Sequence, residues 1–324
     1  MNNEIIKENE TVNEDSLFRI VGNDAVASEK IIAPRYSYSR SVLRVFFRKK
    51  SNYFLISLFL IVMLTAFIIP SFCHYDEYEN VTDASSFNLS PAAAIAKYGF
   101  SFKYLLGTGS TGNSISYGIF ASARTSLSLA IICAAINMTV GIIVGAIWGY
   151  SKKFDQIMIV FYNIIANVPY LLLISVLVYI IGSGFWPFVF ALTITGWLSI
   201  AYFFRTQVMI IRDREYSLAS KCLGTPINRI VTKNLLPFLV SVIVTILATE
   251  LPSYISSEVF LTYIGIGLSA NIPSLGRMIS VAQTAFMTYP WTFWPPVSIS
   301  AIITIVLYLL GQNLADATDP RTHM

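Results

Sequence analysis

Two carboxylates, Glu250 and Glu258, stand inside a long apolar segment. A charge is costly in such a setting unless it serves a function or has a buried partner. Eight residues apart on a helix, the two side chains project within about 80° of each other, so both can face one interior. We expect a polar lining that meets a solute, with Arg124 as a candidate ion-pair partner of Glu250. A solvated helix end is the alternative for either carboxylate.

Side chains for metal or hydrolytic chemistry are sparse. His74 and His323 are far apart, and Cys73, Cys133 and Cys222 have no paired metal-ligand spacing. No glycine is followed by lysine, so the phosphate-binding loop G-x-x-x-x-G-K-[ST] is absent from the sequence. We therefore expect no enzyme activity, metal site or bound cofactor on this chain. Partner chains would bind any ATP and Mg²⁺ that it depends on.

The elements that position these carboxylates are predicted to be membrane-spanning helices. The 324 residues are 55% hydrophobic and 12% charged, whereas soluble domains average about 25% charged residues. Runs without Asp, Glu, Lys or Arg reach the roughly 20 residues that cross a bilayer. We predict an all-α polytopic membrane protein with six spans. The expected spans are residues 52–72, 123–150, 155–181, 187–211, 237–265 and 293–314.

Basic residues orient the spans, because short cytoplasmic segments retain Lys and Arg during insertion. Six of them lie between Arg35 and Lys50, before the first span, and both termini are therefore predicted to be cytoplasmic. Orientation explains the basic residues, so they do not indicate nucleic-acid binding. The predicted parts are a tail at 1–50 with a mostly disordered start, a first helix at 51–72, an extracytoplasmic loop at 73–112, and a membrane domain at 113–324 containing a cytoplasmic loop at 212–236.

The loop 212–236 carries the signals of two short helices. A helix over 212–223 is followed by Gly224, which can adopt the positive φ that ends a helix. Thr225 is a suitable N-cap, and Pro226 a suitable first residue, for a second helix that leads into the fifth span. The loop is thus predicted to be a stiff elbow. An ordinary amphipathic surface loop is the alternative that these residues leave open.

This loop resembles the conserved cytoplasmic loop of importer-type ABC-transporter permeases, written E-A-A, three residues, G, nine residues, I, one residue, L-P. The spacing is kept, but Leu218 occupies the acidic position and Asn234 the isoleucine position. "REY" at 214–216 also matches the residues that often precede the motif in peptide permeases. The matching positions are Leu218, Ala219, Ser220, Gly224, Asn234, Leu236 and Pro237.

Other segments resemble the C-type permease subunit of oligopeptide and dipeptide importers. Residues 104–131 are similar to its G-T-D-x-x-G…G-A-R-x-S-L stretch, with Gly109 at the aspartate position and Ser122 at a glycine position. "SSEVFLTYIGIGL" at 256–268 and "PSLGRMIS" at 273–280 resemble further family segments. The terminal "GQNLADATDPR" is most similar to Ami-type oligopeptide permeases of Gram-positive bacteria. The resemblance covers about residues 36–324.

The resemblance implies a type I ABC importer permease fold in the bacterial cytoplasmic membrane. The implied partners are a homologous second permease, two cytoplasmic ABC ATPases that bind ATP and Mg²⁺, an extracytoplasmic substrate-binding protein or lipoprotein, and an oligopeptide substrate. In that family the quoted loop couples the ATPases to the spans. The coupling residues implied here are Arg214, Glu215, Leu218, Ala219, Ser220, Gly224 and Pro237.

Two further groups of residues are assigned to transport. The candidate pathway residues, which would meet the backbone or amino terminus of a peptide, are Glu250, Glu258, Arg124 and Asn167. Asn167 precedes Pro169, where a kink either frees a carbonyl to line a cavity or serves packing alone. The loop 73–104 and the segment 269–278 are both expected to face outside and meet the binding protein, and a merely exposed loop is the alternative for the first. The candidate docking residues are Pro273, Ser274 and Gly276.

Other functions remain open at this point. A self-sufficient secondary transporter or channel would need no ATPase, and a membrane scaffold or sensor would give no solute flux. Within the importer interpretation, the sequence does not separate oligopeptides from dipeptides, glutathione or nickel chelates, because the binding protein determines much of that choice.

Overall fold

The computed structural model describes residues 38–226, 229–235 and 239–318. The chain divides into two units, Met1–Tyr38 and Ser39–Met324, and the second unit is described below. Its described residues form helices and loops and contain no strand, apart from one isolated β-bridge between Thr108 and Ser114. This confirms the all-α prediction. The expected disorder of the first thirty residues lies outside the described residues.

Within the described residues, five helices are long and apolar enough to cross a membrane. They are α3 (Lys50–Phe72), α5 (Ile115–Tyr150), α8 (Phe185–Arg212), α11 (Val240–Tyr263) and α13 (Pro290–Thr318). The third predicted span is a pair, α6 (Lys152–Ala166) and α7 (Tyr170–Ile181), bent by 83°. Taking the pair as one broken span gives the six that the sequence predicts.

The second span begins earlier than predicted. α5 starts at Ile115 because Ser114 caps it, its hydroxyl accepting a hydrogen bond from the amide of Tyr117. Arg124, which the prediction placed at the start of this span, lies on an exposed face of the helix without ending it. With 36 residues, α5 is about 54 Å long, which exceeds the thickness of a bilayer core.

Shorter helices occupy segments predicted as tail or loop. α2 (Tyr38–Arg48) precedes the first span with basic residues on one face and apolar residues on the other. The outer loop contains η1 (Ala84–Ser86), α4 (Pro91–Tyr98) and η2 (Phe102–Tyr104). α12 (Leu275–Gln283) lies in the segment predicted as an outer loop. On the cytoplasmic side lie α9 (Glu215–Cys222) and η3 (Ile230–Leu235).

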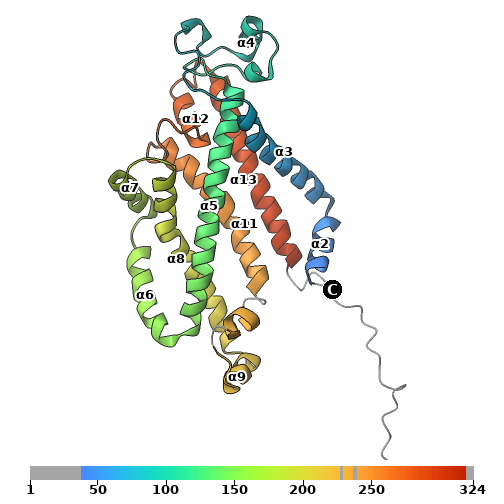
Figure 1. Ribbon diagram of the computed structural model, residues 1–324, viewed down its shortest axis with the longest axis vertical. Helices are drawn as coiled ribbons and strands as arrows, with labels where there is room; N and C mark the ends of the chain where they lie inside the picture. The colour runs from blue at the N-terminus through green and yellow to red at the C-terminus, as the bar shows by residue number, and fades with distance from the viewer. Residues whose placement is uncertain (1–37, 227–228, 236–238, 319–324) are drawn as a thin grey trace, which may run out of the picture. The chain divides into compact units, whose positions relative to one another are not determined.

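α5 runs through the bundle between the end that carries α4 and the end that carries α9 (Figure 1). Its glycines allow α8 to approach closely. A Cβ on Gly145 would lie 2.6 Å from the carbonyl oxygen of Ala201 and 2.6 Å from Cβ of Phe204, and Gly141 and Gly149 meet α8 in the same way. Small residues spaced four apart let two helices approach closely in this way.

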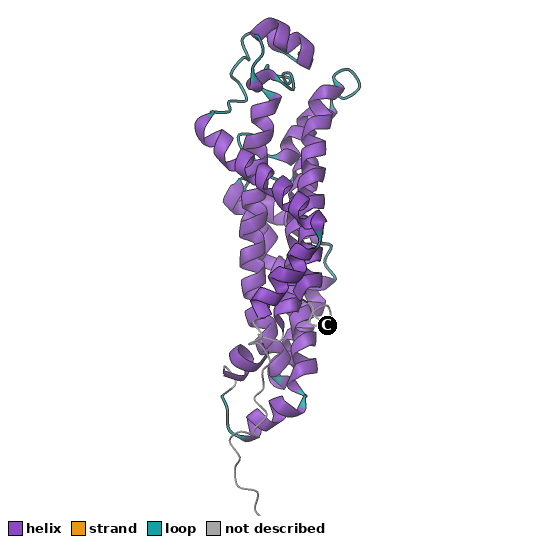
Figure 2. Ribbon diagram, turned by 90° about the vertical axis from the view of Figure 1, so that its right-hand side faces the viewer, coloured by secondary structure: helices purple, strands orange, loops and turns teal. Residues whose placement is uncertain are grey.

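The start of α3 and the end of α13 lie at the same end of the bundle. Lys49 Nζ lies 3.0 Å from Asp316 Oδ2, and Asn313 donates a hydrogen bond of 2.7 Å to Asn52. The view in Figure 2 shows the long helices running side by side. Because the first span starts and the last span ends at the same end of the bundle, the chain crosses it an even number of times.

Candidate functional site

The cytoplasmic elbow begins at the end of α8. The predicted helix over 212–223 is wrong at its start, because α8 runs on through Arg212 and the chain breaks before α9 begins at Glu215. Gly224 has φ +74°, as the sequence predicts for a residue that ends a helix. The amides of Leu223 and Thr225 bond back to the carbonyls of Ala219 and Ser220, at 3.1 and 3.2 Å. These bonds complete the end of α9.

The elbow is fixed to two spans. Ser217 is buried and donates a hydrogen bond of 3.0 Å to the carbonyl of Ile211, within α8. Arg212 donates to the carbonyl of Gly149 at 2.8 Å, near the end of α5. It also forms an ion pair with Asp213 at 2.9 Å. A force on α9 is therefore transmitted directly to α8 and α5.

The other face of α9 is exposed. Among the predicted coupling residues, Arg214, Glu215, Ala219 and Gly224 are exposed and Ser220 is half-buried. Leu218 is 47% exposed and the neighbouring Leu223 is 85% exposed. Apolar side chains grouped at the exposed tip of a polar segment mark a surface for a partner. Pro237 and the L-P step of the loop lie outside the described residues.

A clamp that sequence reasoning missed lies just above the elbow. Asp155 of α6 accepts hydrogen bonds from Trp148 Nε1 at 2.7 Å and from Arg205 Nη2 at 2.9 Å. The Arg205 guanidinium lies over the rings of Trp148 and Tyr202, 5.5 and 5.6 Å from their centroids. The clamp joins α5, α6 and α8. The sequence signal for this clamp is weak: Asp155 and Arg205 each stand beside a charge-free run, and they are 50 positions apart.

Glu258 occupies neither of the two expected positions. Its side chain is 0% exposed in this chain, so it is neither solvated nor on an open lining. It accepts hydrogen bonds from Ser126 at 2.6 Å and Thr262 at 3.2 Å. Ser126 also accepts a bond of 3.3 Å from the amide of Leu275. The carboxylate therefore joins α11 to α5 and, through Ser126, to the start of α12.

Glu250 is placed differently from its expected pairing. It is half-buried and interacts with the hydroxyl of Tyr254, one helical turn along α11. Arg124 is exposed on α5, and among the described residues no ion pair joins it to Glu250. The predicted ion pair between Arg124 and Glu250 is therefore wrong. Arg124 lies near the outer end of α5, whereas Glu250 lies midway along α11, and this separation in depth keeps them apart.

Asn167 caps the end of α6 at the 83° bend. It is exposed, and its side chain donates a hydrogen bond of 2.6 Å to the carbonyl of Asn163. α7 restarts after Pro169, whose carbonyl accepts from the amide of Leu173 at 3.1 Å. Irregular backbone at membrane depth is tolerated only against protein or a water-filled cavity. The bend therefore does not belong in contact with lipid.

Two of the three predicted docking residues are buried within the chain. Ser274 is 0% exposed and caps α12, accepting from the amide of Arg277 at 3.2 Å. Gly276 packs on α11, since a Cβ there would lie 2.7 Å from the carbonyl oxygen of Val259. Neither can touch a docking protein in this structure. Pro273 lies at the surface of a small outer cavity of about 50 Å³.

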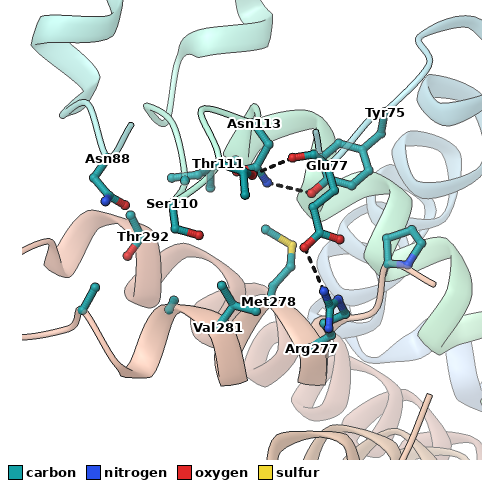
Figure 3. A pocket seen from close by; sticks show the side chains of 15 residues that line it. Tyr75, Glu77, Asn88, Ser110, Thr111, Asn113, Arg277, Met278, Val281 and Thr292 are labelled. Carbon is teal, nitrogen blue, oxygen red and sulfur yellow. Dashed lines mark hydrogen bonds and ion pairs between the residues drawn. The ribbon is translucent and has the colours of Figure 1, made fainter. Parts of the chain in front are cut away.

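That cavity lies between the outer loop and α12 (Figure 3). Arg277 Nη2 lies 2.9 Å from Glu77 Oε1, and Thr111 donates to the carbonyl of Glu77 at 2.5 Å. Asn113 donates to the Tyr75 hydroxyl at 2.7 Å. Burial raises the pKa of the Tyr75 phenol to about 12, against the opposing effect of the Asn113 hydrogen bond. These contacts fix the outer loop to the membrane domain.

A second group of polar contacts stabilises the outer loop itself. Lys97 Nζ lies 2.6 Å from Asp83 Oδ2, and the hydroxyls of Ser85 and Ser86 each donate to the same carboxylate at 2.6 Å. The hydrogen bond from Lys97, followed by those from Ser85 and Ser86, holds the pKa of Asp83 well below its usual range. The carboxylate is therefore ionised at any physiological pH, and the ion pair persists.

Long apolar helices, a broken span and an elbow fixed to the ends of the spans define a polytopic membrane protein. The chain belongs to the family of binding-protein-dependent transport system inner membrane components, whose family model matches residues 137–324. It is accordingly a multi-pass transport subunit of a cytoplasmic membrane and not an enzyme. The family resemblance read from the sequence is confirmed.

Named relatives agree with this assignment. The chain is 43% identical over 306 residues to the oligopeptide transport system permease protein AmiD of Streptococcus pneumoniae, covering 94% of this chain and 97% of that protein. It is 30% identical to the dipeptide transport system permease protein DppC of Bacillus subtilis, covering 91% and 89%. It is 28% identical to the oligopeptide permease OppC of the same organism, covering 94% and 97%.

Proposed function

We propose that this chain is one of two membrane subunits of an ATP-driven importer that carries oligopeptides into the cell. The observation that carries the proposal is the elbow: α9 is fixed to the end of α8, which holds the end of α5 through Arg212, and it is followed by Gly224 at φ +74°, while Leu218 and Leu223 are exposed. Identity to an oligopeptide permease over nearly the whole chain supports the substrate class. ATP and Mg²⁺ would reside on partner ATPases.

The geometry supports a mechanism in which α9 is the coupling helix. An ATPase that grips its exposed face, with Arg214, Glu215, Leu218, Ala219, Ser220 and Gly224, moves the end of α8 when ATP closes the ATPase dimer. Because Arg212 holds Gly149 and Asp155 holds Arg205, α5 and α6 move with it. The bundle then exchanges an inward-open for an outward-open state. A peptide crosses because the two states make different contacts with it and with its carrier.

The pathway and docking assignments are also proposals. Glu250 and the bend at Asn167 are retained as pathway residues, because both lie at membrane depth and are not fully covered by this chain. For the extracytoplasmic binding protein we propose the rim of the outer cavity around Pro273. The Glu77–Arg277 ion pair fixes this rim, while Ser274 and Gly276 act beneath it by holding α12 in place.

The test is reconstitution of this chain in liposomes, alone and with its second permease, ATPases and binding protein. Uptake of a labelled oligopeptide should need the complete set together with ATP on the cytoplasmic side. Flux through the chain alone, without ATP, would instead support a self-sufficient transporter or channel. Absence of flux with every component active would favour a scaffold or sensor.

A further inference from the structure

A set of polar groups lies at mid-membrane depth where α5, α7, α8 and α11 approach one another. Asn137 of α5 is 0% exposed, and its Nδ2 donates to the Tyr254 hydroxyl at 2.6 Å and to the carbonyl of Leu192 at 3.4 Å. Tyr254 in turn interacts with Glu250. Glu250 and Tyr254 are one helical turn apart on α11, so the carboxylate is a neighbour of the phenol that the buried amide contacts.

Two acceptors of this set have no partner. Asn137 Oδ1 and Thr195 Oγ1 are buried and form no hydrogen bond in the described part of the chain. A Cβ on Gly196 would lie 3.1 Å from Cγ of Asn137, so α8 approaches this amide closely at the residue next to Thr195. A buried acceptor without a donor carries a desolvation cost, so such groups indicate a missing partner.

A cavity of about 180 Å³ opens beside Thr195 and Gly196, in the angle between α6 and α7 and against α8. Its polar lining residues are Tyr162, Tyr170, Thr195 and Ser199. Tyr170 lines this cavity, is 41% exposed and lies near Glu250 and Tyr254. The cavity is large enough for several waters, at about 30 Å³ each. It therefore suits a small polar end group.

The chemistry of the free groups selects a positively charged donor. A carboxylate, an amide oxygen and a hydroxyl oxygen are all acceptors, and aromatic rings attract cations. No ion pair joins Glu250 to a described Lys, Arg or His. A primary ammonium group supplies one positive charge and three N–H donors. It fits this set better than a peptide carboxylate, which the Glu250 carboxylate would repel.

We propose that Glu250, Tyr254, Asn137 and Thr195 form a subsite for the free α-ammonium group of the transported peptide, reached past Tyr170 from the angle of the broken span. The proposal rests on the proposed function, and it goes further by naming the peptide group that is recognised and the residues that recognise it. The subsite recognises the amino terminus of the peptide and not its side chains. Such recognition suits a transporter that accepts peptides of many sequences.

The experiment uses the intact importer with Cys73, Cys133 and Cys222 replaced by serine and a single reporter, Thr195→Cys. The rate of labelling by a positively charged thiosulfonate is measured with trialanine, with N-acetyl-trialanine and without peptide. Trialanine should slow labelling. The acetylated peptide should need an about tenfold higher concentration to give the same protection, because it cannot form one of the charge-assisted hydrogen bonds. Glu250→Gln should remove this difference while the complex still assembles. A Leu64→Cys reporter, on the exposed apolar face of α3, should respond to neither peptide.

Three results would overturn the subsite. Equal protection by both peptides excludes recognition of the ammonium group, and no protection by either excludes a peptide site. Loss of complex assembly in Glu250→Gln would mean that the carboxylate pairs with a cation of the second permease instead. ATP-driven uptake of trialanine by the unmodified importer is measured in parallel. Trialanine uptake without protection of the cysteine would contradict the subsite alone. Protection of the cysteine without trialanine uptake would contradict the proposed function alone.

Discussion

Single hydroxyl groups connect distant helices in this protein, and Ser126 is the clearest case. It donates to Glu258 on α11 and accepts from Leu275 on α12. Ser126→Ala would leave the buried amide of Leu275 without a partner and would remove the shorter of the two hydrogen bonds that Glu258 accepts, so we expect the free energy of unfolding to fall by about 1–3 kcal/mol. Ser128→Ala, two residues along α5 and half-buried, is the matched control. Thermal unfolding in detergent, followed by tryptophan fluorescence, measures both, and equal melting temperatures would contradict the prediction.

A second prediction at the residue scale concerns Gly224. Its φ of +74° disfavours any residue with a Cβ, although open space surrounds it. Gly224→Ala should strain the elbow by about 1–2 kcal/mol and lower the number of peptides imported per ATP hydrolysed. Gly182→Ala places the same kind of strain at φ +102°, also in open space, at the end of α7. If both variants reduce coupling equally, strain in general is responsible and the elbow has no special role.

Helix pairs set the rigidity of the membrane domain, and α5 packs closely against α8. Gly145→Leu would force a side chain into the carbonyl of Ala201 and Cβ of Phe204. Overpacking of this kind costs about 1–3 kcal/mol or more. We expect a lower melting temperature and weak recovery from membranes. Ile143→Leu, on an exposed face of the same helix, should change neither, and unchanged stability of Gly145→Leu would show that the helices can separate freely.

α3 and α6 both expose apolar side chains, Ile157, Val160 and Ile164 in the case of α6, but they differ in their polar residues and in how they end. α3 exposes Leu60, Ile61, Leu64 and Ile68, which suits lipid. α6 has no buried residue in this chain, yet it carries polar Asn163 and ends at a break in the helix. We infer that α3 lies against the bilayer, while α6 and α7 lie against the second permease or the pathway.

For the whole molecule, the expected topology is testable from both sides of the membrane. Thr82→Cys lies in the exposed outer loop and Leu223→Cys at the exposed tip of the elbow, each introduced without the native cysteines. A membrane-impermeant thiol reagent should label Thr82→Cys in intact cells and Leu223→Cys only after lysis. Labelling in the reverse order would invert the orientation, and it would remove the cytoplasmic location on which coupling depends.

The sequence by itself determined the features that depend on local composition. Charge-free runs long enough for a bilayer predicted the spans, and the distribution of Lys and Arg predicted their orientation. Gly224 was predicted at positive φ because helix ends favour glycine there. Each of these follows from a preference of a few neighbouring residues, so no knowledge of distant contacts is needed.

Only the tertiary structure decided which polar groups meet. Glu258 is hydrogen-bonded to Ser126, which lies 132 positions away in the sequence. Asn137 and Tyr254 are 117 positions apart, and Arg277 and Glu77 are 200 positions apart. The sequence instead paired Glu250 with Arg124 and placed Ser274 and Gly276 on a docking surface. It also gave no angle for the 83° bend at Asn167. Such pairings depend on the depth and rotation of separate helices, which are set by packing among residues far apart in the chain and not by local preference.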